Sequence, residues 1–291
     1  DASLTQLVAM QEDGHWSDAR TTAAAILALS GEGSTLSKGP HSRSVRGAVH
    51  WLSKQVNPKT GLLIHTGPYD DTTHAWALAA IADIAHLDRS TVGKTFTKRL
   101  VKGALGLQQE SGLWGQDKAV VETTAQMLLA LNIAEKAGVD VADEAIERAL
   151  SALDQITDAR TGKVTAFKRA TAIDTTQATS AVVMAKLLNG RLPAADKLLA
   201  RSLDLLEKEL NEKSRSIKLY LKVSDLEFWG WTTLCRAQMG DDKAWRWTGF
   251  QRAAAAAIAA KEGSSEEPAK ALALSTMIFG AAYRYETVME K

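Results

Sequence analysis

The sequence predicts an all-α protein whose helices form six hairpins in a ring, an α/α toroid with an inner and an outer layer of helices. Only five prolines occur in 291 residues while Ala and Leu are abundant, a composition that favours helices. A pair of hydroxyl side chains recurs along the chain in steps of 51, 51, 52, 57 and 43 residues. Six copies at a nearly constant spacing indicate a repeat architecture.

Each hydroxyl pair opens a stretch that is apolar around most of its circumference, as expected of a buried inner helix. The inner helices should therefore begin near Thr21, Thr72, Thr123, Thr175, Thr232 and Ser275. Amphipathic stretches, the expected outer helices, lie at 1–11, 41–56, 90–109, 143–156, 194–213 and 244–262. A glycine-bearing loop joins each outer helix to the inner helix that follows it.

The hairpins are expected to close on themselves within a single domain, 1–291. A closed ring exposes no end repeat, which agrees with the lack of a polar capping repeat at either end of the sequence. An open solenoid of helix pairs is the alternative. No Pro-, Gly- or Ser-rich linker divides the chain.

Composition excludes several classes of partner. The net charge is +1 with acids and bases interspersed, so nothing indicates a nucleic acid or an anionic membrane surface. No apolar run is long enough to span a bilayer. The single cysteine, Cys235, excludes an internal disulfide framework, and its apolar surroundings favour a buried thiol. The sequence begins at Asp1 without an initiator methionine, which fits removal of a signal peptide and leaves the compartment open.

The loops before the inner helices carry a recurring pattern. "QEDGHW" (11–16) and "QQESGLW" (108–114) resemble the glutamine–tryptophan repeats of squalene cyclases, and "TGLL" (60–63) and "TGKV" (161–164) keep only the glycine. The chain thus resembles the terpene cyclase and protein prenyltransferase superfamily, which implies the toroid fold. In physical terms, Gly112 should permit a tight turn, and Trp114 should lie across the outer-helix ends with its N–H on a carbonyl.

A closer resemblance is to bacterial single-toroid proteins known as prenyltransferase or squalene oxidase repeat proteins. It rests on Tyr69–x–x–x–x–His74–Ala75 and on the segments 227–247 and 271–286. The resemblance implies no assigned activity, and no cofactor.

The motifs of the catalytic relatives are incomplete here. Acid-initiated cyclases use Asp–x–Asp–Asp, and in "PYDDTT" Pro68 replaces the first aspartate before Asp70 and Asp71. Such cyclases also need an aromatic cavity, whereas this chain has 8 Trp, 4 Tyr and 5 Phe. The zinc site of protein prenyltransferases needs a late histidine, but the last one is His86, so no metal is predicted. The Gly–Cys–Gly–Glu–Gln run of thioester toroids does not occur.

The acids before the hydroxyl pairs have a structural interpretation as helix caps. Asp18, Asp71, Glu122 and Asp174 each lie where an inner helix should begin, and a carboxylate there accepts backbone N–H groups. The second repeat differs because it also carries His74, where the other repeats have Ala, Ala, Gln, Leu and Met. Helical spacing lets this histidine meet either acid.

Two hypotheses about function follow. The first is a noncatalytic domain that binds an unidentified small molecule or protein at the face of the inner-helix N-termini. Its ligand-binding candidates are Trp16, Tyr69, Trp114, Trp229 and Trp231, whose alternative role is packing between hairpins. The second is an acid–base enzyme, either isoprenoid cyclase-like or polysaccharide lyase- or glycosidase-like. Its catalytic candidates are Asp70, Asp71 and His74.

Overall fold

A computed structural model describes residues 2–64, 71–115, 120–165, 172–215 and 268–284. Within these ranges the chain forms ten α-helices and no β-strand, and only three isolated β-bridges occur, in connecting loops. The prediction of an all-α protein is confirmed. No helix in the same ranges has the length and apolarity to cross a membrane.

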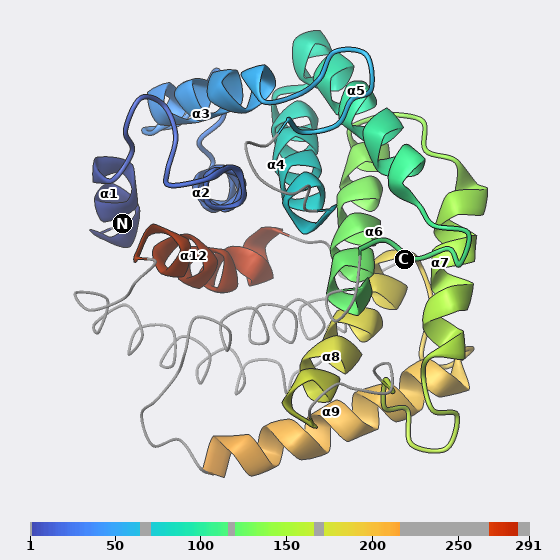
Figure 1. Cartoon of the computed structure of the whole chain (residues 1–291). Helices are drawn as coiled ribbons and strands as arrows, with labels where there is room; N and C mark the ends of the chain where they lie inside the picture. The colour runs from blue at the N-terminus through green and yellow to red at the C-terminus, as the bar shows by residue number, and fades with distance from the viewer. Residues whose placement is uncertain (1, 65–70, 116–119, 166–171, 216–267, 285–291) are drawn as a thin grey trace.

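Five helices form the inner layer (Figure 1). They are α2 (Ala19–Gly31), α4 (Asp71–Asp88), α6 (Val120–Lys136), α8 (Ala172–Leu188) and α12 (Pro268–Arg284). Successive members from α2 to α8 pack against each other, and α12 packs against α2. In α4 every residue from Thr73 to Ala85 is buried, which fits a helix enclosed on all sides.

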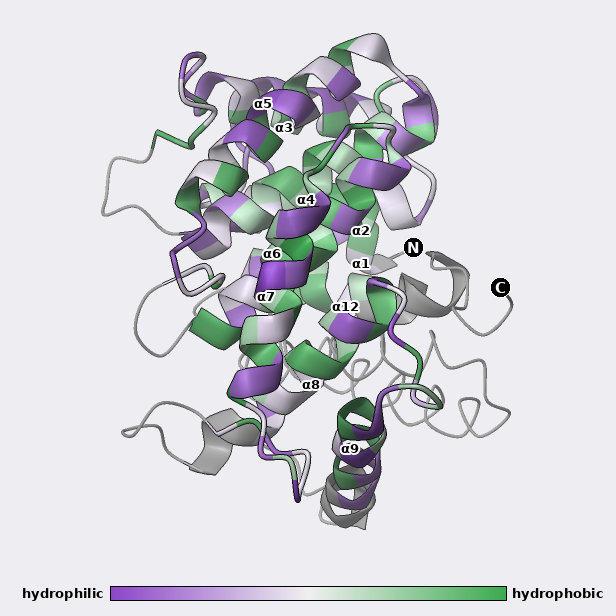
Figure 2. Ribbon diagram, turned by 90° about the vertical axis from the view of Figure 1, so that its right-hand side faces the viewer, coloured by the Kyte–Doolittle hydropathy of each residue, from purple (hydrophilic) through white to green (hydrophobic). Residues whose placement is uncertain are grey.

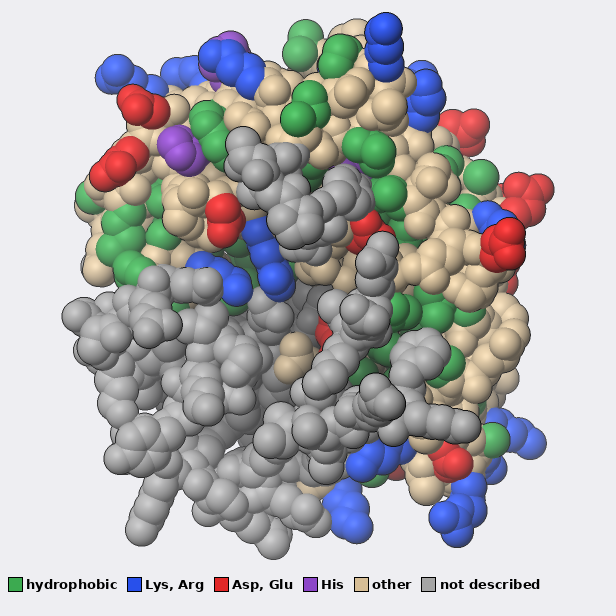
Figure 3. All heavy atoms as spheres, viewed as in Figure 1, with side chains coloured by type: hydrophobic (Ala, Val, Ile, Leu, Met, Phe, Trp, Pro, Cys, Tyr) green, Lys and Arg blue, Asp and Glu red, His purple; other side chains and the backbone are tan. Residues whose placement is uncertain are grey.

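The outer helices lie between them in the sequence. They are α1 (Ala2–Ala9), α3 (Ser42–Lys54), α5 (Thr91–Leu107), α7 (Asp143–Gln155) and α9 (Lys197–Arg215). In α3 the buried residues are Val45, Ala48 and Leu52, a single stripe at helical spacing that faces α2. Figure 2 shows hydrophilic residues of α3 and α5 on the outside. Among the described residues on the face in Figure 3, acidic and basic side chains are interspersed.

The predicted beginnings of the inner helices agree with the structure in four repeats and fail in the last. The hydroxyl pairs lie in the first turns of α2, α4, α6 and α8. However, α12 begins at Pro268, well before Ser275. Proline suits the first turn of a helix because its missing N–H would have no partner there. Ser275 and Thr276 are buried within α12, and the Thr276 hydroxyl donates back to the Leu272 carbonyl.

The fifth inner helix, expected near Thr232, and the outer helix expected at 244–262 lie outside the described residues.

A glycine in each connecting loop presses against the next outer helix. Gly14, Gly61, Gly112 and Gly162 all have positive φ and face α3, α5, α7 and α9 in turn. A Cβ on Gly61 would collide with the Arg99 carbonyl oxygen, and one on Gly112 would lie 2.7 Å from that of Arg148. The turn predicted at Gly112 is confirmed. These contacts connect successive hairpins through the backbone.

Candidate functional site

The acid–histidine group of the second repeat lies at the beginning of α4. Asp71 is the first residue of this helix and His74 the fourth. Asp70 and Tyr69 lie outside the described residues, as do Trp229 and Trp231. The geometry of the predicted sites therefore rests on Asp71 and His74, together with the two tryptophans of the first and third repeats.

His74 is fully buried between α4 and α5. Its Nε2 lies 3.0 Å from the Leu100 carbonyl oxygen, and a Cβ on Gly103 would lie 3.1 Å from its Cε1. Because a carbonyl only accepts, Nε2 carries the proton of the neutral ring. The buried Nδ1 has no hydrogen-bond partner among the described residues.

Burial also sets the charge of this ring. It lowers the pKa of His74 from 6.5 to about 4, against the opposing effect of the hydrogen bond to Leu100. The imidazole is therefore neutral at pH 7. The ring packs against Gly103 of α5, which also contacts Gly61, and its hydrogen bond to Leu100 joins the inner helix α4 to the outer helix α5.

Asp71 joins the second hairpin to the third. Its Oδ2 accepts a hydrogen bond of 2.9 Å from the Gly115 backbone N–H, 44 residues further on. Beside it, the hydroxyls of Thr72 and Thr123 lie 2.6 Å apart. The carboxylate that was predicted to cap α4 thus binds a backbone N–H of the neighbouring loop.

The other acids were expected to cap their own helices. Asp18 does so, since its Oδ1 accepts a 2.7 Å hydrogen bond from the Thr21 backbone N–H at the beginning of α2. Glu122 instead lies inside the first turn of α6, where a negative charge still complements the helix dipole. Asp174 occupies the corresponding third position of α8.

Trp16 and Trp114 are buried, with 1% and 0% of their surface exposed. The Trp16 indole N–H donates to the Leu7 carbonyl, and that of Trp114 donates to the Ala104 carbonyl, both at 2.7 Å. Each indole therefore lies against the outer helix of its own hairpin, as predicted for Trp114. These two side chains are therefore buried within their own hairpins and do not contribute to an exposed binding patch.

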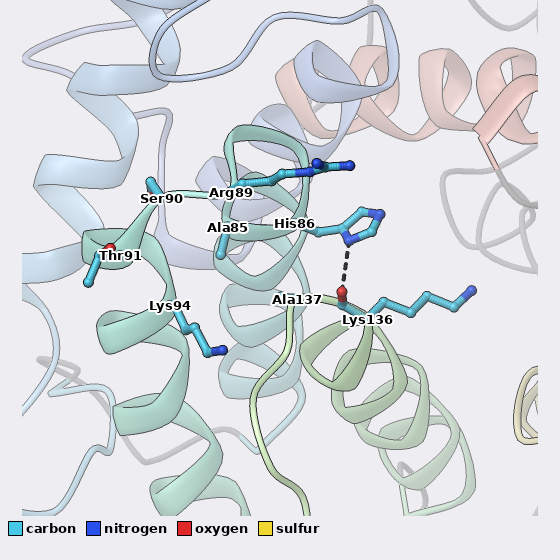
Figure 4. A pocket seen from close by; sticks show the side chains of 8 residues that line it. All are labelled: Ala85, His86, Arg89, Ser90, Thr91, Lys94, Lys136 and Ala137. Carbon is cyan, nitrogen blue, oxygen red and sulfur yellow. Dashed lines mark hydrogen bonds between the residues drawn. The ribbon is translucent and has the colours of Figure 1, made fainter.

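A pocket that sequence reasoning missed lies at the opposite end of α4. Its volume is about 360 Å³, and it lies where the C-terminal ends of α4 and α6 meet the beginning of α5 (Figure 4). Its lining consists of Ala85, His86, Arg89, Ser90, Thr91, Lys94, Lys136 and Ala137. Three of these side chains, those of Arg89, Lys94 and Lys136, are basic, and none is acidic.

Local structure holds these groups in place. The His86 Nδ1 lies 2.9 Å from the Lys136 carbonyl oxygen, so it donates to the C-terminal end of α6. Ser90 caps α5 by accepting a 3.0 Å hydrogen bond from the Gly93 N–H. Arg89 connects α4 to α5 with a φ of 51°, in the left-handed region. Lys94 reaches from α5 to the turn after α6, where a Cβ on Gly138 would lie 2.9 Å from its Nζ.

The acid nearest to this pocket in sequence is engaged elsewhere. Asp88 accepts hydrogen bonds from the Thr35 hydroxyl, the Leu36 N–H and the Ser37 hydroxyl, at 2.6, 2.8 and 2.6 Å. Burial raises the pKa of Asp88, but these bonds outweigh that effect and hold it below its usual value. The carboxylate stays charged and points to the loop after α2.

No model of a known protein family matches this chain, and no curated protein matches it significantly. Among the described residues, no group of three or more His, Cys, Asp or Glu side chains is placed to hold a metal ion. The sequence signal for the pocket was weak because Arg89 and Lys94 lie more than 40 residues from Lys136. Only the packing of α4 and α5 against α6 brings them together.

Proposed function

We propose that the six hairpins close into an α/α toroid and that this toroid is a noncatalytic ligand-binding domain. Closure is supported by α12, which packs against α1 and α2 although more than 230 residues separate them in the sequence (Figure 1). The inner helices α2, α4, α6 and α8 follow one another around the same arc. The fifth hairpin would complete the circle.

The resemblance to squalene cyclase and prenyltransferase repeat proteins belongs to the same proposal. Support comes from the equivalence of the first and third loops. In both, an indole N–H reaches a carbonyl of the preceding outer helix, and the tryptophan backbone N–H donates to a threonine hydroxyl of the following inner helix. Sequence-distant loops thus repeat one set of contacts, as expected of true structural repeats.

One observation favours binding over catalysis. Two of the three groups expected to carry acid–base chemistry connect hairpins, since His74 is enclosed against Leu100 and Asp71 holds the Gly115 N–H, whereas Asp70 lies outside the described residues. A general acid or base must reach the proton that it transfers, and a fully enclosed ring cannot. By contrast, the cationic pocket lies about 22 Å along α4, at its other end. This pocket is the proposed ligand site.

The test compares catalysis and binding in the same set of proteins. The full chain is incubated with a panel of isoprenoids and polysaccharides, and turnover is followed by mass spectrometry. In parallel, native mass spectrometry detects small molecules retained from a cell extract. Asp71→Asn and His74→Gln serve as site variants, Arg89→Gln/Lys94→Gln as the pocket variant and Lys98→Gln as an exposed control on α5.

We expect no turnover, and a retained small molecule that only the pocket variant loses. Turnover that disappears in Asp71→Asn or His74→Gln, with helicity preserved, would replace this proposal by the acid–base enzyme. Retention that survives in the pocket variant would place the ligand elsewhere in the ring.

A further inference from the structure

We propose that the α4–α5–α6 pocket binds the phosphate group of its ligand. This inference rests on the proposed binding function and adds the chemical class of the ligand. Three cations from three separate elements line the pocket: Arg89 from the α4–α5 connection, Lys94 from α5 and Lys136 from α6. In Figure 4 the side chains of Arg89, His86 and Lys136 extend toward the same side.

The lining of the pocket contains no acidic side chain. Neither the Arg89 guanidinium nor the Lys94 ammonium has a carboxylate partner within the described part of the chain. The adjacent Asp88 is held by the loop after α2. Glu135 is next to Lys136 in sequence but does not line the pocket. Burial raises its pKa, and so do two acids beyond the end of α6: Asp143, the first residue of α7, and Asp140, which precedes α7.

The backbone at the pocket is also compatible with an anion. The beginning of α5 carries the positive end of a helix dipole. The C-terminal ends of α4 and α6 carry partly negative carbonyl oxygens, but three carbonyls at the end of α6 already accept hydrogen bonds within the protein. The His86 Nδ1–H donates to the Lys136 carbonyl, the Gly138 N–H to that of Glu135, and the Val139 N–H to that of Ala134. The C-terminal end of α6 therefore offers little repulsion.

Size and donor chemistry select the class of anion. A volume of about 360 Å³ is at the small end of ligand pockets, so it accommodates a phosphate group with a modest organic part. An arginine provides a planar pair of N–H donors, and lysines add point charges, a combination that suits phosphate oxygens. The Ser90 and Thr91 side chains supply two further hydroxyls to the lining.

The experiment uses inorganic phosphate and phenyl phosphate as probes, in calorimetric titrations at constant ionic strength maintained with chloride. Variants are Arg89→Gln, Lys94→Gln and the double substitution. Lys98→Gln is the matched control, because it removes the same charge from an exposed position of α5 outside the pocket. Circular dichroism and thermal melts establish that each variant is folded.

We expect both probes to bind the wild type, and each pocket substitution to raise Kd by about tenfold or more. The Lys98→Gln variant should change Kd by less than about twofold, since a distant exposed charge is screened. Equal weakening in Lys98→Gln and the pocket variants, or no binding of either probe, would overturn the inference. If the pocket variants still lost the ligand retained from extract, only the phosphate assignment would fail and the binding function would stand.

A separate arm identifies the source of the phosphate. The same proteins are sedimented with vesicles that contain phosphatidic acid and with vesicles of neutral lipid. Retention on the acidic vesicles that requires Arg89 and Lys94 would assign the pocket to a lipid headgroup. Phosphate binding without such retention would assign it to a soluble phosphorylated molecule. Vesicle retention that is indifferent to both residues would argue against a phosphate site at this pocket.

Discussion

His74 should make the stability of this protein fall as the pH drops from 7.5 to 5. In the folded chain its pKa is about 4 because the ring is enclosed, whereas in the unfolded chain it returns to 6.5. Above pH 6.5 the ring is neutral in both states and contributes no pH dependence. Between 6.5 and 4 the unfolded chain binds a proton that the folded chain does not, so the free energy of unfolding decreases.

The size of the effect follows from these two pKa values. The loss at pH 5 is about 2 kcal/mol, and it levels off near 3 kcal/mol below pH 4, where the folded ring also takes up a proton. The variant His74→Gln has no titrating ring and still offers an amide N–H to the Leu100 carbonyl. Its stability should depend less on pH over the same interval.

Urea unfolding followed by circular dichroism at pH 7.5 and pH 5.0 measures this difference. The quantity of interest is the change in unfolding free energy between the two pH values, wild type minus variant, because titrating acids contribute equally to both. His50→Gln, an exposed position on α3, is the matched control and should behave as the wild type. If His74→Gln lost as much stability as the wild type between these pH values, the enclosed neutral ring would be refuted.

Three further predictions, tested with five substitutions, concern side-chain and backbone contacts and are measured by chemical denaturation. Asp196→Asn should lower the free energy of unfolding by about 1–3 kcal/mol because it leaves the buried Lys186 ammonium with fewer charged partners. Lys186→Met removes the buried charge itself and should lower it by less. The reverse order would contradict this account of the ion pair between Lys186 and Asp196. Gly61→Ala should cost more than about 3 kcal/mol, since its Cβ would collide with a backbone carbonyl of α5. Gly33→Ala, with similar φ but open space around it, should cost only about 1 kcal/mol, and equal costs would refute the contact. Trp114→Phe should cost about 1–3 kcal/mol through the orphaned carbonyl of α5, and an unchanged urea midpoint would exclude that hydrogen bond.

Local patterns in the sequence determined where the helices lie and whether each is a buried inner helix or an amphipathic outer helix. The apolar circumference of α4 and the single apolar stripe of α3 are visible as spacings within 20 residues, so helix type and burial could be predicted. The role of Gly112 and the N–H partner of Trp114 followed from the same local chemistry. The beginning of α12 was missed because the hydroxyl pair of this repeat, Ser275 and Thr276, lies within the helix, whereas the helix begins at Pro268.

The contacts of the candidate site were decided only by tertiary structure. Asp71 has the residue type and position of a helix cap, yet its carboxylate also accepts a hydrogen bond from a backbone N–H 44 residues away. His74 was correctly singled out as unusual, but its enclosure depends on how closely Gly103 lets α5 approach α4.

The cationic pocket shows most clearly the difference between what local sequence determines and what tertiary structure decides. Arg89 and Lys136 each look like an ordinary exposed charge at the end of a helix, and nothing in either neighbourhood predicts a site. Helix formation is set by interactions within a few residues, which a sequence displays directly. Which side chains share a pocket is set by the packing of α4, α5 and α6, and therefore by distances that only the folded chain defines.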